Sequence, residues 1–240
     1  MKSYLAFCLA ALMATGAMVC SRAEDARQQN VPRPDAPQAS ARPLDIHQLA
    51  QAVDEHYNHL RSLEADFTEI YRGSGTEREE SGTLLLKKPR KMRWEYRSPR
   101  VKLFVSDGQS VWFYLPAEKQ LRRTDLRRLD DVRSPIAFLL GKTKLEKELQ
   151  GLSEAPDQAP IHSGDTVLRG VPRGFVDQLS EVQLEITPAH QIARIVLVEP
   201  DGGTTEFRFS GWKENSDMAD SQFRFSPPAG VETIEGELSP

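Results

Sequence analysis

From Leu63 onward the chain alternates apolar and polar residues in short runs that end at turn-forming residues. In the first run Leu63, Ala65 and Phe67 alternate with polar neighbours, and this period of two places the apolar side chains on one face of a strand. Further strand-like runs span 82–87, 91–97, 101–106, 110–115, 180–187, 191–199, 204–212 and 223–225. Because the early connections are short, the pattern predicts an antiparallel meander.

Two short segments predict tight turns between strands. Asp107-Gly108 is typical of a type I′ hairpin turn, and Gly73-Ser74-Gly75 indicates a flexible hairpin tip. The latter segment is too short for the strand-to-helix turn that exposes a serine nucleophile, and a polar run follows it.

Two helices are expected beside the strands. Asp45 can cap the first helix, Gln48 completes a capping box, and apolar residues then recur at helical spacing. Ser134-Pro135 opens a second helix that Gly141 is placed to end. A long antiparallel sheet must curl, so the two helices are candidates to cover its open side.

The N-terminal segment has the composition of an export signal. Met1-Lys2 leads into the apolar run 4–19, and Ser21-Arg22-Ala23 offers small residues for cleavage, so residues 1–23 are expected to be a signal peptide. Lipidation at Cys20 is the alternative, although Val19 is a branched residue where lipoprotein signals prefer a small one. Residues 24–43 are proline-rich and are expected to form a disordered linker, which leaves 44–240 as one domain.

Cysteine and charge content exclude several classes of function. The only two thiols, Cys8 and Cys20, lie in the expected signal peptide, so the mature chain offers no disulfide, cysteine nucleophile or thiolate metal ligand. Without residues 1–23 the chain has 29 basic and 35 acidic side chains, a formal charge of −6. This balance argues against nucleic acid as a partner.

No recognised catalytic, metal or cofactor motif is present. The five histidines fit no triad or ligand pattern, and His56 and His59 share a helix face without a nearby carboxylate motif. Neither a phosphate loop nor a dinucleotide fingerprint occurs. We therefore expect a protein that is not an enzyme and binds no metal or cofactor. A lipid hydrolase is an alternative, but it would need a buried nucleophile beside a base.

Aromatic residues are concentrated in the expected strands. They can fill an ordinary packed core or line a ligand cavity, and periodicity does not choose between the two. These residues are Trp94, Tyr96, Phe104, Trp112, Phe113, Tyr114, Phe207, Phe209, Trp212, Phe223 and Phe225.

Several segments, in their order, resemble the outer-membrane lipoprotein carrier family (LolA). They are GTLLLKKPRKMRWEY at 82–96, SPR at 98–100, LFVSDGQSVWFYLP at 103–116, SPIAFLLG at 134–141 and SQFRFSPPAGV at 221–231. With the first helix and strand, the resemblance covers nearly the whole domain. It implies a mainly β fold with an α lid, an incomplete, half-open antiparallel β-barrel covered by short helices.

The resemblance also implies a function and its partners. The expected protein is a monomeric periplasmic carrier that takes acylated lipoproteins from an inner-membrane ABC-type releasing complex. It passes them to a receptor or to the outer membrane. The alternatives are a lipid-anchored outer-membrane receptor, an envelope-stress sensor built on a related barrel, or a carrier of another lipid.

Strand parity and helix spacing give candidate residues for the lipid-binding cavity and its lid, with ordinary core packing as the alternative for each. Parity places Met92, Trp94 and Tyr96 on one face, which we assign inward. The cavity candidates are Leu84, Leu86, Met92, Trp94, Tyr96, Leu103 and Val105. The lid candidates are Leu49, Val53, Tyr57, Leu60, Ile136, Leu139 and Leu140.

Two further features are candidates for contacts with the lid and with partners. Lys88 precedes Pro89, where the family usually has an arginine that latches the lid by hydrogen bonds to backbone carbonyls. Lysine lacks the planar fork of arginine, so the resemblance implies a looser latch, unless Lys88 is merely a solvated turn residue. A basic run is the candidate docking surface for an acidic partner, or else a solvated face. It contains Arg122, Arg123, Arg127 and Arg128.

Overall fold

The alternating runs pair into one large sheet in the computed structural model, which describes residues 45–125, 139, 144–174 and 176–235. The strands are β1 (Ser62–Gly73), β2 (Thr76–Lys87), β3 (Lys91–Ser98), β4 (Lys102–Asp107), β5 (Ser110–Leu115), β6 (Gln120–Asp125), β7 (Leu149–Glu154), β8 (Thr166–Pro172), β9 (Glu181–Ile186), β10 (Ile192–Val198), β11 (Thr204–Glu214) and β12 (Glu232–Glu235). The helices are α1 (Ile46–His59), η1 (Pro116–Glu118), α3 (Leu145–Glu148) and η3 (Asp220–Phe223). The expected signal peptide, the linker and most of the second expected helix lie outside the described residues.

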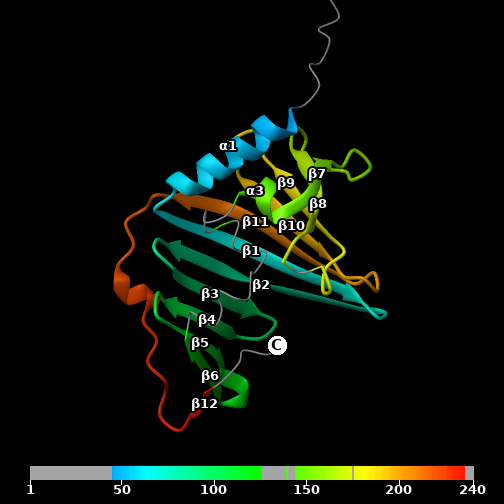
Figure 1. Cartoon of the computed structure of the whole chain (residues 1–240). Helices are drawn as coiled ribbons and strands as arrows, with labels where there is room; N and C mark the ends of the chain where they lie inside the picture. Colours follow the sequence, from blue (N-terminus) through cyan, green and yellow to red (C-terminus); the bar gives the residue numbers. More distant parts are fainter. Residues whose placement is uncertain (1–44, 126–138, 140–143, 175, 236–240) are drawn as a thin grey trace, which may run out of the picture. The chain divides into compact units, whose positions relative to one another are not determined.

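The strand order is β12-β6-β5-β4-β3-β2-β1-β11-β10-β9-β8-β7. Every pair is antiparallel except β12 with β6, which is parallel. Within the described part of the chain β7 and β12 are the two edges and do not pair, so the sheet stays open (Figure 1). The structure thus confirms a mainly β fold with an incomplete antiparallel barrel. None of the described helices has the length and apolar composition needed to cross a membrane.

Helix α1 begins as the sequence predicts. The Asp45 carboxylate accepts a hydrogen bond from the Gln48 N–H (3.1 Å), which satisfies one of the free donors at the helix start. Ala50, Val53 and Tyr57 lie at helical spacing and are buried against the sheet. Figure 1 shows α1 lying across one face of the sheet, which is called the inner face below.

Both predicted hairpin turns are present, and one of them has a different type from the one expected. Ser74 and Gly75 connect β1 to β2 with φ of +51° and +74°, the double positive φ of a type I′ turn. In the β4–β5 turn Gly108 has φ +99° but Gln109 is not in the positive region. A glycine at the first central position alone is typical of type II′, so the prediction of type I′ at Asp107-Gly108 was wrong.

The segment 223–225, expected to be the final strand, is not a strand. Phe223 ends η3 and is fully buried, and Phe225 packs against Tyr114 with ring centroids 5.4 Å apart. The alternating aromatic residues therefore anchor an irregular segment to the sheet through their rings rather than through a hydrogen-bond ladder. The last strand is β12, which follows Pro227-Pro228.

The start of η3 is fixed to the β2–β3 hairpin by charge. Lys87 and Lys91 hold the Asp220 carboxylate at 2.7 and 2.6 Å. Their hydrogen bonds lower the pKa of Asp220 to about 2.

Candidate functional site

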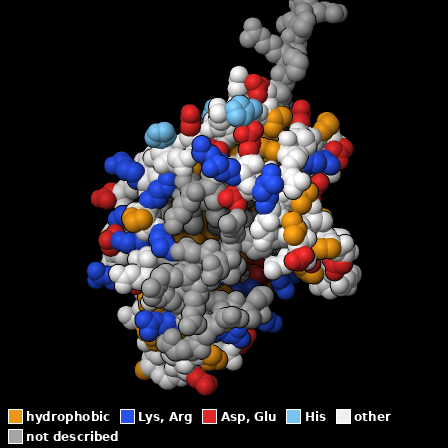
Figure 2. Space-filling model, in the orientation of Figure 1, with side chains coloured by type: hydrophobic (Ala, Val, Ile, Leu, Met, Phe, Trp, Pro, Cys, Tyr) orange, Lys and Arg blue, Asp and Glu red, His pale blue; other side chains and the backbone are white. Residues whose placement is uncertain are grey.

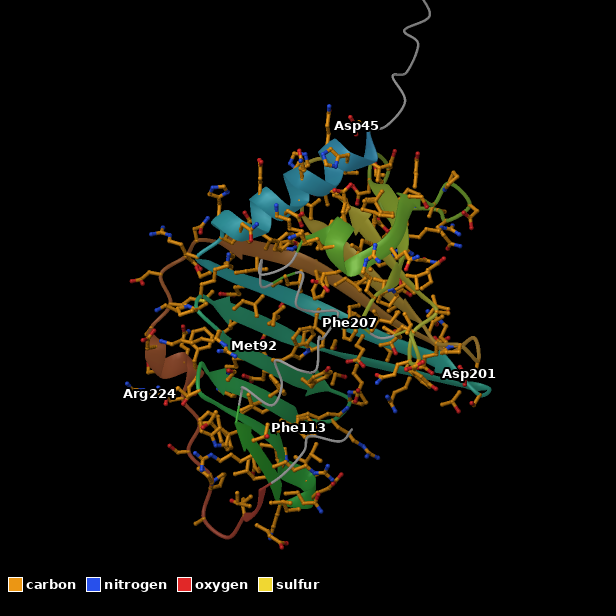
Figure 3. All side chains as sticks on the ribbon, viewed as in Figure 1. Asp45, Met92, Phe113, Asp201, Phe207 and Arg224 are labelled. Carbon is orange, nitrogen blue, oxygen red and sulfur yellow. The ribbon has the colours of Figure 1, made fainter. Side chains whose placement is uncertain are left out.

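Strand register shows which side chains share the inner face. Across β2, β3 and β4, Leu84 lies opposite Trp94, and Trp94 lies opposite Phe104. Directly opposed residues in antiparallel strands point to the same face. The predicted residues Leu84, Leu86, Met92, Trp94 and Tyr96 all pack in the cluster that α1 covers. Figure 3 shows Met92, Phe113 and Phe207, from β3, β5 and β11, on this same face.

The register corrects the prediction for β4. Leu103 lies opposite Glu95, and Val105 lies opposite Arg93, so both point to the outer face, away from α1. Both residues are buried there, beneath the segment that contains η3. The residue of β4 that packs against the inner cluster is Phe104. Both faces of β4 are apolar, and for that reason parity within the strand could not choose between them.

Aromatic rings form the centre of the inner face. Trp94 packs against Phe67 with ring centroids 4.8 Å apart, and Phe207 and Phe209 meet it edge-on at 5.8 and 6.4 Å. Phe67 also packs edge-on against Tyr96 at 4.9 Å. Such contacts bury large apolar areas without directional hydrogen bonds. The centre of the inner face is thus held together by apolar area.

Polar side chains border these rings on β1 to β4. The Tyr96 hydroxyl donates to the Glu69 carboxylate (2.5 Å), and the Lys102 ammonium donates to Glu80 (2.6 Å). Glu69 and Glu80 lie opposite each other on β1 and β2. Burial raises the pKa of Glu69, and the neighbouring Glu80 charge acts in the same direction. Burial, followed by the Glu69 charge, also raises the pKa of Tyr96. We call Glu69, Glu80, Tyr96 and Lys102 the polar margin.

Lys88 binds the C-terminal end of α1. Its ammonium donates to the backbone carbonyl oxygens of Tyr57 (2.6 Å) and Asn58 (2.9 Å). The last carbonyls of a helix have no partner within the helix and carry the negative end of its dipole. Burial lowers the pKa of Lys88. The geometry is that of the predicted latch, with one ammonium reaching two carbonyls.

Other side chains hold α1 along its length. The buried Tyr57 hydroxyl accepts a hydrogen bond from the Ile192 N–H of β10 (2.9 Å), and burial raises the pKa of this tyrosine. Asp54 accepts from the Leu145 N–H at the start of α3 (3.0 Å). Burial raises the pKa of Asp54.

Two histidines of α1 add contacts with carboxylates. His47 lies 2.9 Å from the Glu146 carboxylate, and this hydrogen bond raises the pKa of His47. His56 lies 3.0 Å from Glu214 of β11. Sequence reasoning missed these partners because they lie about 100 or more residues away along the chain.

The predicted lid residues that the structure describes pack onto the inner cluster. Val53, Tyr57 and Leu60 are buried there, and Leu49 is partly buried against it. Leu139 is 3% exposed and belongs to the same cluster. Ile136 and Leu140 lie outside the described residues.

The two predicted docking arginines that the structure describes do not share a face. On β6, Arg122 lies opposite Phe113 on the inner face, whereas Arg123 lies opposite Trp112 on the outer face. The Arg123 guanidinium is 5.9 Å from the Trp112 ring centroid. Arg127 and Arg128 lie outside the described residues. Figure 2 shows basic and acidic side chains interspersed over the visible surface.

One group of possible metal ligands in the described part of the chain comprises His162, Asp165 and Glu185. Glu185 accepts hydrogen bonds from the backbone N–H groups of Ile161 (2.7 Å) and His162, and its other oxygen lies 2.7 Å from Arg194. These contacts fix the β7–β8 connection to the outer face. The group is therefore accounted for as a structural anchor, away from the aromatic cluster.

An open antiparallel sheet with an aromatic inner face and a side-chain-anchored helix over it defines a class of half-open β-barrel proteins. Residues 58–226 match the family model described as outer membrane lipoprotein carrier protein LolA. The chain belongs to this family.

Two relatives and one solved structure illustrate what the chain is similar to. The outer-membrane lipoprotein carrier protein of Dechloromonas aromatica is 30% identical over 205 residues, which cover 80% of this chain and 90% of the relative. The protein of the same name in Chromobacterium violaceum is 29% identical over 178 residues, 74% of this chain and 82% of the relative. A solved LolA superfamily structure from Nitrosomonas europaea aligns with a TM-score of 0.43 at 13% identity, covering 76% of this chain and 98% of that one.

Proposed function

We propose that this protein carries lipoproteins through the periplasm by sheltering their acyl chains on the inner face beneath α1. The observation that carries the proposal is the aromatic cluster around Trp94, which is closed by a helix held through side-chain contacts. Each acyl CH₂ removed from water contributes about 0.8 kcal/mol, so a lipoprotein cannot cross an aqueous space unaided. No covalent step is needed for this task.

Transport requires release as well as binding. The aromatic walls hold hydrocarbon through area rather than through directional bonds, and area can be exchanged for the surface of a membrane or receptor. The contacts of Lys88 with Tyr57 and Asn58 are polar and lie at the edge of the domain. Breaking them would free the C-terminal end of α1 and open the inner face.

The proposed route begins at an inner-membrane ABC-type releasing complex and ends at an outer-membrane receptor or the membrane itself. Export would remove residues 1–23, and residues 24–43 would link the new N-terminus to the folded domain. The family is consistent with a monomeric carrier. The net negative charge of the chain is consistent with a protein that makes no contact with nucleic acid.

The direct test is extraction of a labelled triacylated lipoprotein from inner-membrane vesicles that contain the releasing complex and ATP. We expect a soluble one-to-one complex with the wild-type chain. A Phe207→Glu variant places a charge in the cluster and should lose extraction. Arg224→Glu, at the surface away from the inner face, is the matched control. Absence of the soluble complex while the releasing complex hydrolyses ATP would contradict the proposal.

A further inference from the structure

The indole nitrogen of Trp94 is a donor on the inner face that has no hydrogen-bond partner of normal geometry. The side chain is 3% exposed. Its Nε1 is among the few buried side-chain polar atoms of the described residues that have no hydrogen-bond partner. Buried tryptophan N–H groups usually find an acceptor, and an unpaired one is unfavourable.

The neighbours of Trp94 explain why the donor is unpaired. Phe67, Phe207 and Phe209 pack around the ring and offer no oxygen. The Tyr96 hydroxyl oxygen is an acceptor beside the Trp94 N–H, and their contact is a weak one that lacks normal hydrogen-bond geometry. That hydroxyl already donates to Glu69.

The donor also lies at a boundary between two kinds of surface. On one side are the aromatic rings of the inner cluster, and on the other is the polar margin on β1 to β4. An acylated ligand has the same order of apolar and polar groups. A hydrocarbon chain ends at an ester or amide carbonyl, and polar groups follow it.

We propose that the Trp94 N–H donates a hydrogen bond to the ester or amide carbonyl oxygen of a bound acyl chain. This inference rests on the proposed carrier function and specifies its ligand chemistry. The inner face then recognises the acyl group, carbonyl and chain together, rather than hydrocarbon alone.

Pairing this donor also favours the loaded state. In the structure described here the N–H is unpaired, and a bound carbonyl would satisfy it. A ligand shifts a conformational equilibrium only by its differential affinity for the two states. The carbonyl adds to this difference by pairing the Trp94 donor, and an alkyl chain without a carbonyl contributes only its apolar area.

The test compares an ester lipid with its ether analogue, dipalmitoylglycerol with di-O-hexadecylglycerol, by equilibrium transfer from vesicles to the protein. We expect wild-type protein to bind the ester about tenfold more tightly, as for one buried hydrogen bond. Trp94→Phe keeps an aromatic ring but removes the donor, so it should bind both lipids alike. Trp112→Phe, on the outer face, should keep the wild-type preference.

Equal binding of both lipids by wild-type protein would overturn this inference and leave the carrier function standing. The same holds if Trp94→Phe keeps the ester preference. Binding of neither lipid by wild-type protein would overturn the carrier proposal itself.

A measurement on the wild-type tryptophans avoids dependence on the Trp94 variant. The chain has three tryptophans, so ¹⁵N-labelled protein gives three indole N–H signals. Trp112→Phe and Trp212→Phe assign them by elimination. The ester lipid should move the Trp94 signal downfield and slow its exchange with solvent, and the ether should do neither. Identical Trp94 signals with both lipids would also overturn the inference.

Discussion

The ammonium of Lys88 lies 2.6 Å from the carbonyl oxygen of Tyr57, so the β2–β3 turn caps the C-terminal end of α1. Lys88→Met keeps the length of the side chain and removes the charge and donors. We expect a loss of about 1–2 kcal/mol in unfolding free energy and faster amide exchange in the last turn of α1. Lys88→Arg, which can reach the same carbonyls, should retain most of both. Unchanged exchange in Lys88→Met would show that the contact does not hold the helix.

Tyr57 fixes the same helix to β10 through its hydroxyl. Tyr57→Phe removes the acceptor of the Ile192 N–H and leaves that donor buried and unpaired. The expected loss in unfolding free energy is about 1–3 kcal/mol, measured by urea denaturation. Tyr114→Phe, on the outer face, is the control and should cost less. A similar small cost for both variants would mean that the Tyr57 contact is replaced by water.

The two carboxylates of the polar margin should respond oppositely to neutralisation. Burial raises the pKa of Glu69, so its charged form is disfavoured in the folded state. The free energy of unfolding therefore falls as pH rises through the folded pKa of Glu69. Glu69→Gln keeps an acceptor for Tyr96 and should raise the melting temperature at pH 7, with a smaller gain near pH 4. Glu80→Gln breaks the pair with Lys102 and should cost about 2 kcal/mol at pH 7. Equal effects of the two changes would contradict this assignment.

His47 links the start of α1 to α3 in a pH-dependent way. The hydrogen bond to Glu146 raises the pKa of His47 above its ordinary value of about 6.5. A raised histidine pKa means that the contribution is complete below the unfolded value and is lost as pH rises through the folded value. NMR titration should show the His47 pKa falling in Glu146→Gln. The same His47 pKa in both proteins would exclude this contact in solution.

The mature N-terminus separates a free carrier from a lipid-anchored relative. We expect mass spectrometry of the exported protein to find a chain that starts near Glu24 and has no acyl group. An acylated Cys20 would favour the anchored receptor or stress sensor instead.

Most of the strands and the helix start could be predicted from local chemistry. The period of two around Phe67 and the cap at Asp45 each depend on neighbouring residues alone, and both agree with the structure. The charged strand β6 was missed because it contains Arg122 and Arg123 and too few apolar residues to show a period of two. The segment that contains Phe223 was wrongly predicted as a strand. Alternating aromatic residues also occur where rings anchor an irregular segment to a sheet.

The residues of the inner face were predictable only where a strand has a single apolar face. On β3 the choice of Met92, Trp94 and Tyr96 needs no partner strand. On β4 both faces are apolar, so the choice between Leu103 and Phe104 depends on the offset across the β3–β4 turn, which follows from pairing. The contacts of Tyr57 with Ile192 and of Lys88 with α1 join distant segments, and only the folded sheet brings them together.

The β2–β3 hairpin carries Lys88 at its turn and Trp94 in its second strand, six residues further along. The proposed ligand contact and the proposed release of α1 therefore belong to one short, continuous piece of backbone. If ligand binding shifts this hairpin, Lys88 moves with it, and the end of α1 that Lys88 binds is displaced directly. The rest of the sheet could then stay rigid while the affinity for the ligand changes.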